Sequence, residues 1–144
     1  QDLIDRYFLQ YAGVKDFIDR TLEEAHKTGV VSTLLGRRRL LPELQSKNYQ
    51  NRSLAERMAV NTPIQGAAAD LIKLAMLNVH QALHQAGLKT KMILQVHDEL
   101  VFEVPEGELE TVHALVKAEM EGVYPLDVAL VVDVSHGDNW AEAH

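Results

Sequence analysis

The 144-residue sequence contains no cysteine. This absence excludes disulfide bonds and zinc sites built on thiolates, and it agrees with a cytosolic protein. Long apolar runs are also absent, so we expect no membrane-spanning segment, and the first residues lack the pattern of a signal peptide. The chain opens on Gln1 rather than methionine, and we therefore interpret it as a piece of a longer protein.

Positive charge is scarce in this chain. Fourteen lysines and arginines stand against 21 aspartates and glutamates, a formal net charge of -7. This balance argues against a freestanding nucleic-acid-binding protein, which is usually basic. The basic side chains are clustered, however, in Arg37, Arg38 and Arg39 and in the following stretch to Arg57. A locally basic surface beside an acidic metal site can serve phosphate chemistry even when the total charge is negative.

The size and composition are those of one soluble globular domain, with 47% hydrophobic and 24% charged residues. Apolar residues at helical spacing predict helices over 2–11, 14–27 and 109–120, and a long helix that opens at the capping box Ser53–Glu56 and closes at Gly87. Period-two patterns predict a hairpin over 30–41, another over 92–104 and a last strand over 130–135. The expected fold is α+β, an antiparallel sheet centred on the hairpin 92–104 and packed against long helices.

The stretch from Met92 to Val104 organises the chain. Two apolar runs, rich in β-branched and large residues, flank a short polar tip. A two-residue connection implies a tight turn at His97 and Asp98, where aspartate is tolerated because it accepts a positive φ. Glu99 then begins the second strand.

Asp98 and Glu99 are adjacent carboxylates on this expected tip. Magnesium takes oxygen ligands and is commonly held by one or two carboxylates together with substrate phosphates, so the pair is a candidate metal site. The alternative is ordinary turn chemistry, with Asp98 shaping the bend and Glu99 solvated at a strand edge.

Arg57, Asn61 and Gln65 recur at steps of four residues, so a continuous helix places them along one face. Their hydrogen-bonding groups suit the acceptors that every base pair offers in the minor groove. The alternative is a solvated helix face. Pro63 and Gly66 are expected to kink or loosen this helix.

The three arginines at 37–39 also have two interpretations: they form a solvated turn, or they contact the phosphates of a template strand.

Several segments resemble one known family. Gln95-Val-His-Asp-Glu-Leu100 resembles the last polymerase motif of the family A DNA polymerases, the bacterial DNA polymerase I type. Arg57-Met-Ala-Val-Asn-Thr-Pro-Ile-Gln-Gly-Ala-Ala-Ala-Asp-Leu71 resembles the segment before the palm hairpin of that family. Residues 36–39, 122–125 and 139–144 are also similar to it, in the same order along the chain.

The resemblance implies that residues 1–50 form the edge of the fingers with a connecting hairpin and that 51–144 belong to the palm. The implied reaction is template-directed nucleotidyl transfer from a dNTP to a primer 3′ end, with two Mg²⁺ ions in the complete site. Asp98 matches a metal-binding aspartate, Glu99 a supporting carboxylate and His97 a contact to the primer terminus. Primer–template contacts are implied for Arg57, Asn61 and Gln65, and template-strand contacts for Arg37 and Arg38.

Two parts of the family's active site are missing from the sequence: the first metal-binding aspartate and the fingers helix that grips the triphosphate. We therefore expect the chain alone to be inactive and to need the upstream part of the polymerase. An unpaired strand edge is expected to cause self-association. Primer–template DNA and dNTP are the other expected partners, and the bacterial cytoplasm is the expected location.

Two other functions remain open from the residues. One is a non-catalytic module that grips duplex DNA, which would bind with a steep dependence on salt. The other is a metal-dependent phosphohydrolase that uses Asp98, Glu99 and nearby histidines.

Overall fold

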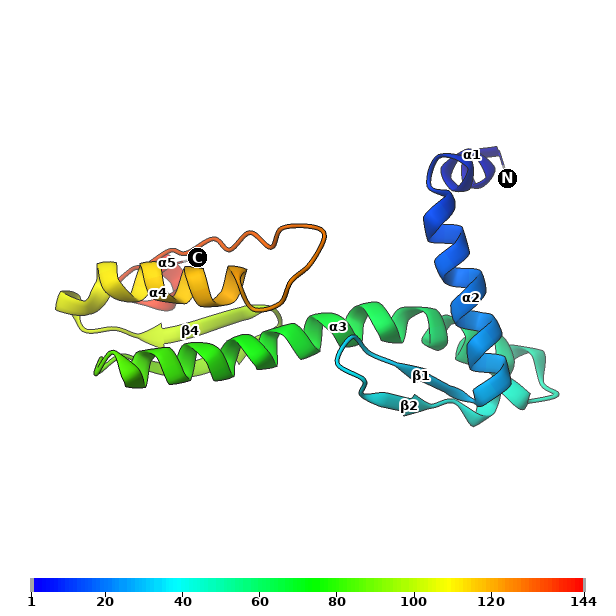
Figure 1. The fold of residues 1–144 in the computed structure, drawn as a ribbon, viewed down its shortest axis with the longest axis horizontal. Helices are drawn as coiled ribbons and strands as arrows, with labels where there is room; N and C mark the ends of the chain where they lie inside the picture. Colours follow the sequence, from blue (N-terminus) through cyan, green and yellow to red (C-terminus); the bar gives the residue numbers. More distant parts are fainter. Residues whose placement is uncertain (1, 144) are drawn as a thin grey trace. The chain divides into compact units, whose positions relative to one another are not determined.

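A computed structural model describes residues 2–143 (Figure 1). The chain forms two compact units, residues 1–70 and 71–144, and the long helix α3 (Tyr49–Gln85) contributes to both. Helices combine with two small antiparallel sheets, each of two strands, so the predicted α+β class is confirmed. None of the helices within 2–143 combines the length and the apolar character needed to cross a membrane.

The first unit contains α1 (Asp2–Gln10), α2 (Ala12–Thr28), the hairpin β1 (Val30–Ser32) and β2 (Arg38–Leu40), the 3₁₀ turn η1 (Pro42–Gln45) and the first part of α3. Gly29 ends α2 with a left-handed φ of 71°, as its position predicts. Six buried side chains form the core of this unit: Ala25, Val31, Leu41, Leu44, Ala55 and Ala59.

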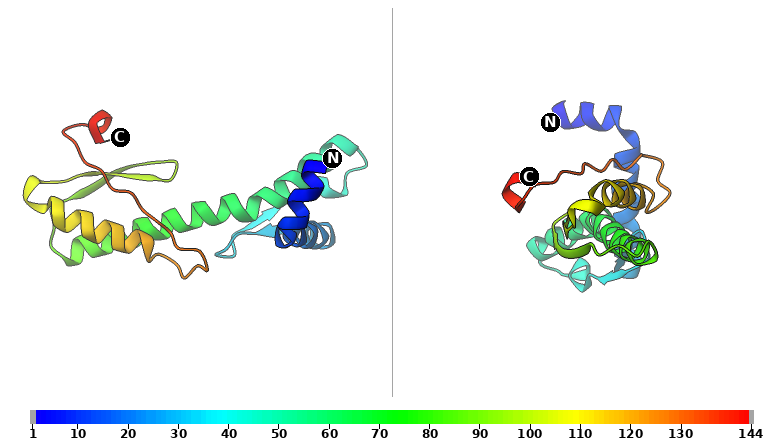
Figure 2. Two further views of the ribbon diagram at one scale, coloured as in Figure 1. Left: turned by 90° about the horizontal axis from the view of Figure 1, so that it is seen from above. Right: turned by 90° about the vertical axis from the view of Figure 1, so that its left-hand side faces the viewer.

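The second unit contains the rest of α3, the hairpin β3 (Lys91–Val96) and β4 (Glu99–Glu103), the 3₁₀ turn η2 (Glu106–Glu108), α4 (Leu109–Glu121) and α5 (Trp140–Ala143). Figure 2 shows α4 running alongside the C-terminal part of α3. Val79 and Leu83 of α3 pack there against Val112 and Val116 of α4. Met92, Phe102 and Val104 cover this cluster from the hairpin, so one face of the sheet packs on the two helices as predicted.

The start of α3 differs from its predicted position, and the helix continues through the proline where a kink or loosening was expected. The helix begins at Tyr49 rather than at the capping box, because Asn48 caps it instead, accepting the N–H of Gln50 at 2.9 Å through its side-chain oxygen. Pro63 lies inside an unbroken helix. The preceding Thr62 donates its hydroxyl to the Met58 carbonyl at 2.7 Å, so a side chain adds a hydrogen bond beside the proline.

The predicted last strand over 130–135 is wrong, because residues 128–137 form no helix or strand. The N–H of Val132 donates to the side chain of Glu121 at 3.0 Å, and not to a neighbouring strand. Val128 and Val131 are 77% and 78% exposed. The alternating pattern is present in the sequence, but a strand also needs a partner to receive its backbone hydrogen bonds.

Candidate functional site

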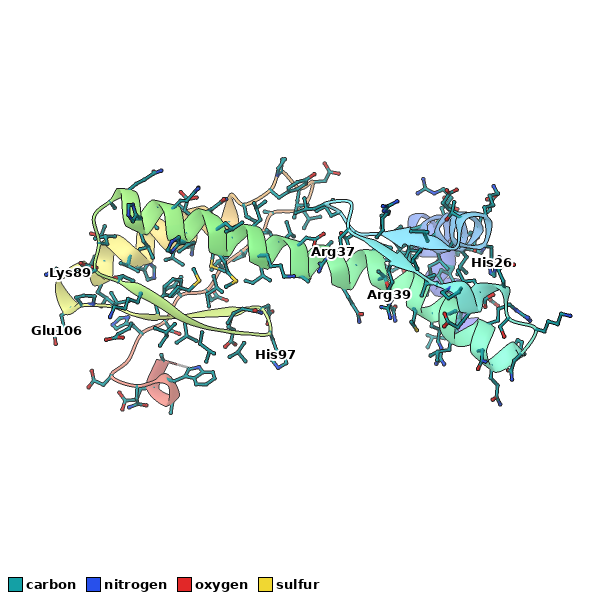
Figure 3. The ribbon with its side chains drawn as sticks, turned by 90° about the horizontal axis from the view of Figure 1, so that it is seen from below. His26, Arg37, Arg39, Lys89, His97 and Glu106 are labelled. Atoms are coloured by element: carbon teal, nitrogen blue, oxygen red, sulfur yellow. The ribbon has the colours of Figure 1, made fainter. Side chains whose placement is uncertain are left out.

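The tip of the β3–β4 hairpin has the predicted two-residue turn. Val96 pairs with Glu99, which leaves His97 and Asp98 as the connection, and all three polar residues of the tip are exposed (Figure 3). The positive φ lies at His97, at 52°, and not at Asp98. This corrects the sequence expectation: a bend that needs a positive φ only at its first residue puts the strain on the histidine.

Neighbouring strand residues hold this tip. The side-chain amide of Gln95 donates to the carbonyl of His97 at 2.5 Å. A bulge at Ile93 interrupts the pairing between Met92 and Leu94, which increases the local twist of β3. The turn therefore ends a short two-stranded hairpin. The strand residues at the other end of this hairpin pack against the core of the second unit.

The carboxylates of Asp98 and Glu99 present oxygen donors at the exposed end of a hairpin. This donor set fits a hard divalent cation. Within residues 2–143 no group of three or more histidine or acidic side chains is close enough to enclose a metal ion. The tip therefore offers part of a metal site, and the phosphates and carboxylates of other molecules or segments would have to complete it.

Arg57, Asn61 and Gln65 lie on the exposed side of α3 in the first unit. Ala55 and Ala59 are buried on another side of the same helix. Since the helix runs unbroken through Pro63, the three polar side chains form the continuous stripe that the sequence predicts. No hydrogen bond within the described residues involves these three side chains, so their polar groups are available to a ligand.

The three arginines follow the turn that connects β1 and β2 (Figure 3). Arg37 forms an ion pair with Asp70 of α3, its Nη2 lying 2.5 Å from Oδ1. Arg39 donates to the hydroxyl of Thr62 at 3.3 Å. Arg38 has no hydrogen bond or ion pair with any residue between 2 and 143. The predicted contacts of Arg37 and Arg38 to DNA remain predictions, and each guanidinium is exposed enough to make them.

Asp70 is the residue of this region that the sequence reading missed. It is 5% exposed, and it accepts the Thr33 hydroxyl and, at 3.3 Å, the N–H of Leu35 in addition to Arg37. The Thr33 hydroxyl lowers the pKa of Asp70 most from its ordinary value of 3.8; burial opposes this, and Leu35 and Arg37 lower the pKa further. The sequence does contain one sign of this role: Asp70 is a single charged residue between Ala69 and Leu71, in an apolar stretch of helix.

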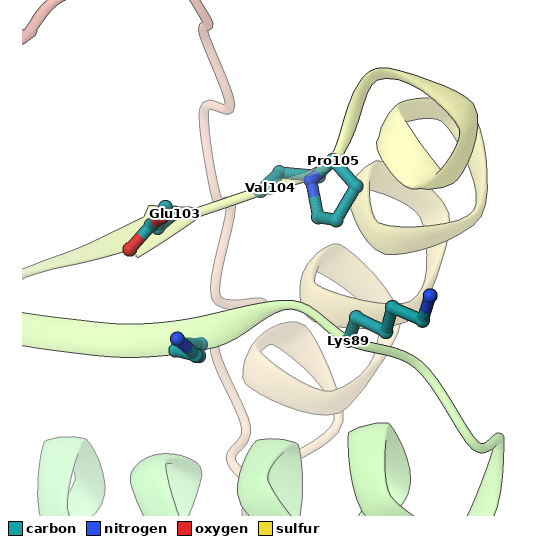
Figure 4. Close-up of a pocket in the computed structure, with 5 residues that line it drawn as sticks. Lys89, Glu103, Val104 and Pro105 are labelled. Carbon is teal, nitrogen blue, oxygen red and sulfur yellow. The ribbon is translucent and has the colours of Figure 1, made fainter.

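A second acid with several hydrogen-bond partners, the half-buried Glu108, lies away from the tip. Glu108 accepts the N–H of Lys89 at 2.8 Å and the hydroxyl of Thr90 at 2.7 Å, which ties the α3–β3 connection to the start of α4. Close by, an open hollow of about 570 Å³ is lined by Lys89, Lys91, Glu103, Val104 and Pro105 (Figure 4). Lys91 pairs with Glu103 at the base of the hairpin, so this hollow lies at the opposite end from Asp98.

The predicted site residues thus fall into two groups. His97, Asp98 and Glu99 lie together at one turn of the second unit, whereas the stripe on α3 and the arginines of the β1–β2 turn belong to the first unit. Each group is assembled within its own unit, and the chemistry of each is distinct: carboxylate oxygens in one, and cationic and amide donors in the other.

Comparison with known proteins identifies a family for almost the whole chain. The model of DNA polymerase family A matches residues 1–142. Over 142 residues the chain is 55% identical to DNA polymerase I of Mycobacterium tuberculosis, a match that covers 98% of the chain and 16% of the relative. DNA polymerase I of Bacillus subtilis is 49% identical over 140 residues, again with 16% of its length covered.

A solved structure of a polymerase also matches this chain in fold and in sequence. The POL domain of Pol1 from M. smegmatis, in complex with a DNA primer-template and dNTP, matches with a TM-score of 0.93 and 52% sequence identity. The match covers 97% of this chain and 25% of that one. The chain spans about a sixth of the length of the curated relatives named above. It belongs to DNA polymerase family A.

Proposed function

We propose that this chain supplies the C-terminal portion of a template-directed DNA polymerase, which transfers nucleotides from dNTPs to a primer 3′ end. The family match and the identity to two bacterial DNA polymerases I support the reaction. The observation that carries the site assignment is the exposed hairpin tip, where Asp98 and Glu99 follow a strained His97 on a packed base. In this proposal the protein acts in the bacterial cytoplasm.

Asp98 holds a divalent metal ion in this proposal, and Glu99 supports the same site. When bound, two Mg²⁺ ions favour attack by the primer 3′-hydroxyl and stabilise the departing pyrophosphate. The chain's own contribution is to place carboxylate oxygens at a fixed position and His97 beside the primer terminus. The upstream part of the polymerase provides the remaining ligands and the triphosphate grip, in agreement with the small share of each relative that this chain covers.

The polar stripe of Arg57, Asn61 and Gln65 contacts the primer–template near the growing end. Donors aimed at minor-groove acceptors sense the shape of a base pair without reading its sequence, which a template-directed enzyme requires. Arg37 and Arg38 contact the phosphates of the template strand. This division assigns residues 1–50 to the edge of the fingers and 51–144 to the palm.

The test is a chimera in which this chain replaces the matching segment of M. tuberculosis DNA polymerase I. We expect primer extension that depends on Mg²⁺ and that Asp98→Asn lowers by about a hundredfold or more, since the removed group acts at the reacting phosphate. Glu103→Gln, which neutralises an exposed carboxylate on the same hairpin, is the matched control and should retain activity. Full activity of the Asp98→Asn chimera would contradict the metal assignment.

The isolated chain should not extend a primer. A mock purification controls for contaminating polymerase. Processive synthesis by the purified chain above this background would show that the metal ligands missing from this chain are not needed. Activity that returns only when the upstream part is added as a separate polypeptide is the expected result.

A further inference from the structure

The β1–β2 turn is fastened to α3 through one buried carboxylate. Asp70, whose side chain is 6% exposed, accepts the Thr33 hydroxyl and the Leu35 N–H, and it pairs with the Arg37 guanidinium at 2.5 Å. Three donors of different chemistry, all from one turn, converge on the same acid. A buried carboxylate needs such partners, because an unpaired charge there would be costly.

The backbone of the turn is fixed as well. The N–H of Thr33 donates to the Arg37 carbonyl at 2.9 Å, and the N–H of Arg37 donates back to the Thr33 hydroxyl at 3.2 Å. Gly36 supplies the positive φ of 80° that the bend needs. On the helix side, Gly66 leaves room for Thr33, because an added Cβ would lie 2.2 Å from its Cγ2. Arg37 therefore extends from a backbone that has little freedom.

One nitrogen of the Arg37 guanidinium is bound, and the rest of the side chain is partly exposed to solvent. Its Nη2 binds Asp70, yet the side chain is 50% exposed. A guanidinium carries five N–H donors in a planar fork, so it can bind a carboxylate with one edge and a phosphate with another. Lysine, with a single ammonium on a flexible stem, cannot divide its donors in this way.

We infer that Asp70 is a positioning residue, which orients the Arg37 guanidinium toward a phosphate of the primer–template. The inference rests on the proposed function, because it presupposes that Arg37 contacts DNA. Its physical basis is preorganisation: an arginine that is already held loses less side-chain freedom when it binds. Asp70 does not touch the DNA and acts through Arg37.

The charge of Asp70 gives the opposite expectation. A carboxylate near DNA repels phosphates, so Asp70→Asn, which makes the net charge less negative, would strengthen binding if charge alone mattered. Positioning predicts weaker binding. The sign of the change therefore separates the two effects.

The experiment measures the affinity of the whole chain for a primer–template duplex over a range of salt concentrations. We expect Asp70→Asn to weaken binding by about three- to tenfold, and Arg37→Ala to reduce the salt slope by about 0.9, the value for one lost phosphate contact. In the Arg37→Ala background, Asp70→Asn should no longer weaken binding, because its positioning effect passes through the arginine. Asp16→Asn, an exposed acid of the same unit, controls for the charge change.

Arg37→Lys keeps Asp70 and its bonds to Thr33 and Leu35, so it tests the inference even if Asp70→Asn unfolds the first unit. It should weaken binding about as much as Asp70→Asn, and affinity equal to the unaltered chain would overturn the inference. Additive effects of Asp70→Asn and Arg37→Ala, or tighter binding by Asp70→Asn, would also overturn it while leaving the proposed function intact. Absence of salt-dependent binding by the unaltered chain would overturn the inference alone, because primer extension by the chimera tests the proposed function independently.

Discussion

His97 has a left-handed backbone conformation, which glycine adopts at no steric cost. Its φ of 52° lies in the left-handed region, where a side chain costs roughly 1–2 kcal/mol. Such strain persists where the surrounding structure enforces it, and here the paired strands and the Gln95 amide do so. The location of the strain, beside the two candidate metal-binding carboxylates, is the reason to connect it with function.

Replacing His97 with glycine should therefore stabilise the hairpin while removing the proposed primer contact. The relief of strain exceeds the greater unfolded-state freedom of glycine, so the net gain should be about 0.5–1 kcal/mol. Hydrogen exchange of the β3 and β4 amides should slow correspondingly. Asp98→Gly is the matched control, and exchange there should quicken because no positive φ is relieved. Faster exchange in His97→Gly would contradict the strain argument.

We expect Glu108 to make the second unit sensitive to acid. The Lys89 N–H lowers the pKa of Glu108 most from its ordinary value of 4.5; partial burial opposes this, and Thr90 lowers the pKa further. A carboxyl whose pKa is lower when folded stabilises the fold above the unfolded value, and the contribution disappears as the pH falls through the folded value. The contacts at Lys89 and Thr90 should therefore loosen below pH 4.5.

Amide exchange at Lys89 and Thr90, corrected for the intrinsic effect of pH, measures this loosening. In Glu108→Gln the exchange should already be fast at neutral pH, and its acid dependence should disappear. Glu106→Gln, an exposed acid of the same 3₁₀ turn, should leave the profile unchanged. A profile that is flat in the unaltered chain would show that this carboxylate does not hold the connection.

Sequence patterns located the candidate turn but not its backbone conformation. The turn at His97 and Asp98, and the first strand position of Glu99, were predicted from alternation and loop length. The left-handed residue was placed at Asp98 because composition alone favours aspartate, whereas the turn type is set by how the two strands twist. Asp70 was missed because its three partners lie more than 30 residues away in the chain.

At the scale of elements, α3 shows what periodicity can and cannot predict. The stripe of Arg57, Asn61 and Gln65 followed from spacing alone, because a helix has a fixed repeat. The kink or loosening expected at Pro63 does not end the helix, which continues through the proline to Gln85. The prediction for residues 130–135 was wrong for a different reason. The sequence alternates as in a strand, but a strand also needs a neighbouring strand to pair with, and the local sequence does not show whether one is present.

Gly66 tests how tightly the β1–β2 turn packs on this helix. Alanine is favoured over glycine inside a helix by about 1 kcal/mol, so Gly66→Ala would ordinarily stabilise α3. Here the new Cβ would lie 2.2 Å from Thr33 Cγ2, and Thr33 is held by its bond to Asp70. Such overpacking costs about 1–3 kcal/mol, so we expect a net loss of about 1 kcal/mol in thermal or urea unfolding of the first unit.

The double variant Gly66→Ala with Thr33→Ser provides the control for that prediction. Serine keeps the hydroxyl that binds Asp70 but lacks the clashing methyl group, so the helix gain should return and the double variant should be at least as stable as the unaltered chain. Stabilisation by Gly66→Ala alone would show that the turn can move away from the helix at no cost.

At the scale of the whole molecule, strand β3 exposes apolar side chains to solvent. Ile93 is 57% exposed and Leu94 45% exposed on β3, a strand with one partner among residues 2–143. Strand edges with unpaired backbone groups and apolar side chains favour pairing with another chain. In the proposed parent protein the upstream part of the polymerase domain would cover this edge, and in the isolated chain another copy can replace it.

We therefore predict that the isolated chain self-associates through β3. Light scattering should give a mass above 16.1 kDa that rises with concentration. Ile93→Lys should return the mass toward the monomer, because a charge at the strand edge opposes pairing between strands. Leu77→Lys removes a comparably exposed apolar side chain, 63% exposed on α3, and adds the same charge, so it should still associate. A monomer at high concentration would contradict self-association, whereas equal effects of the two variants would place it away from the strand edge.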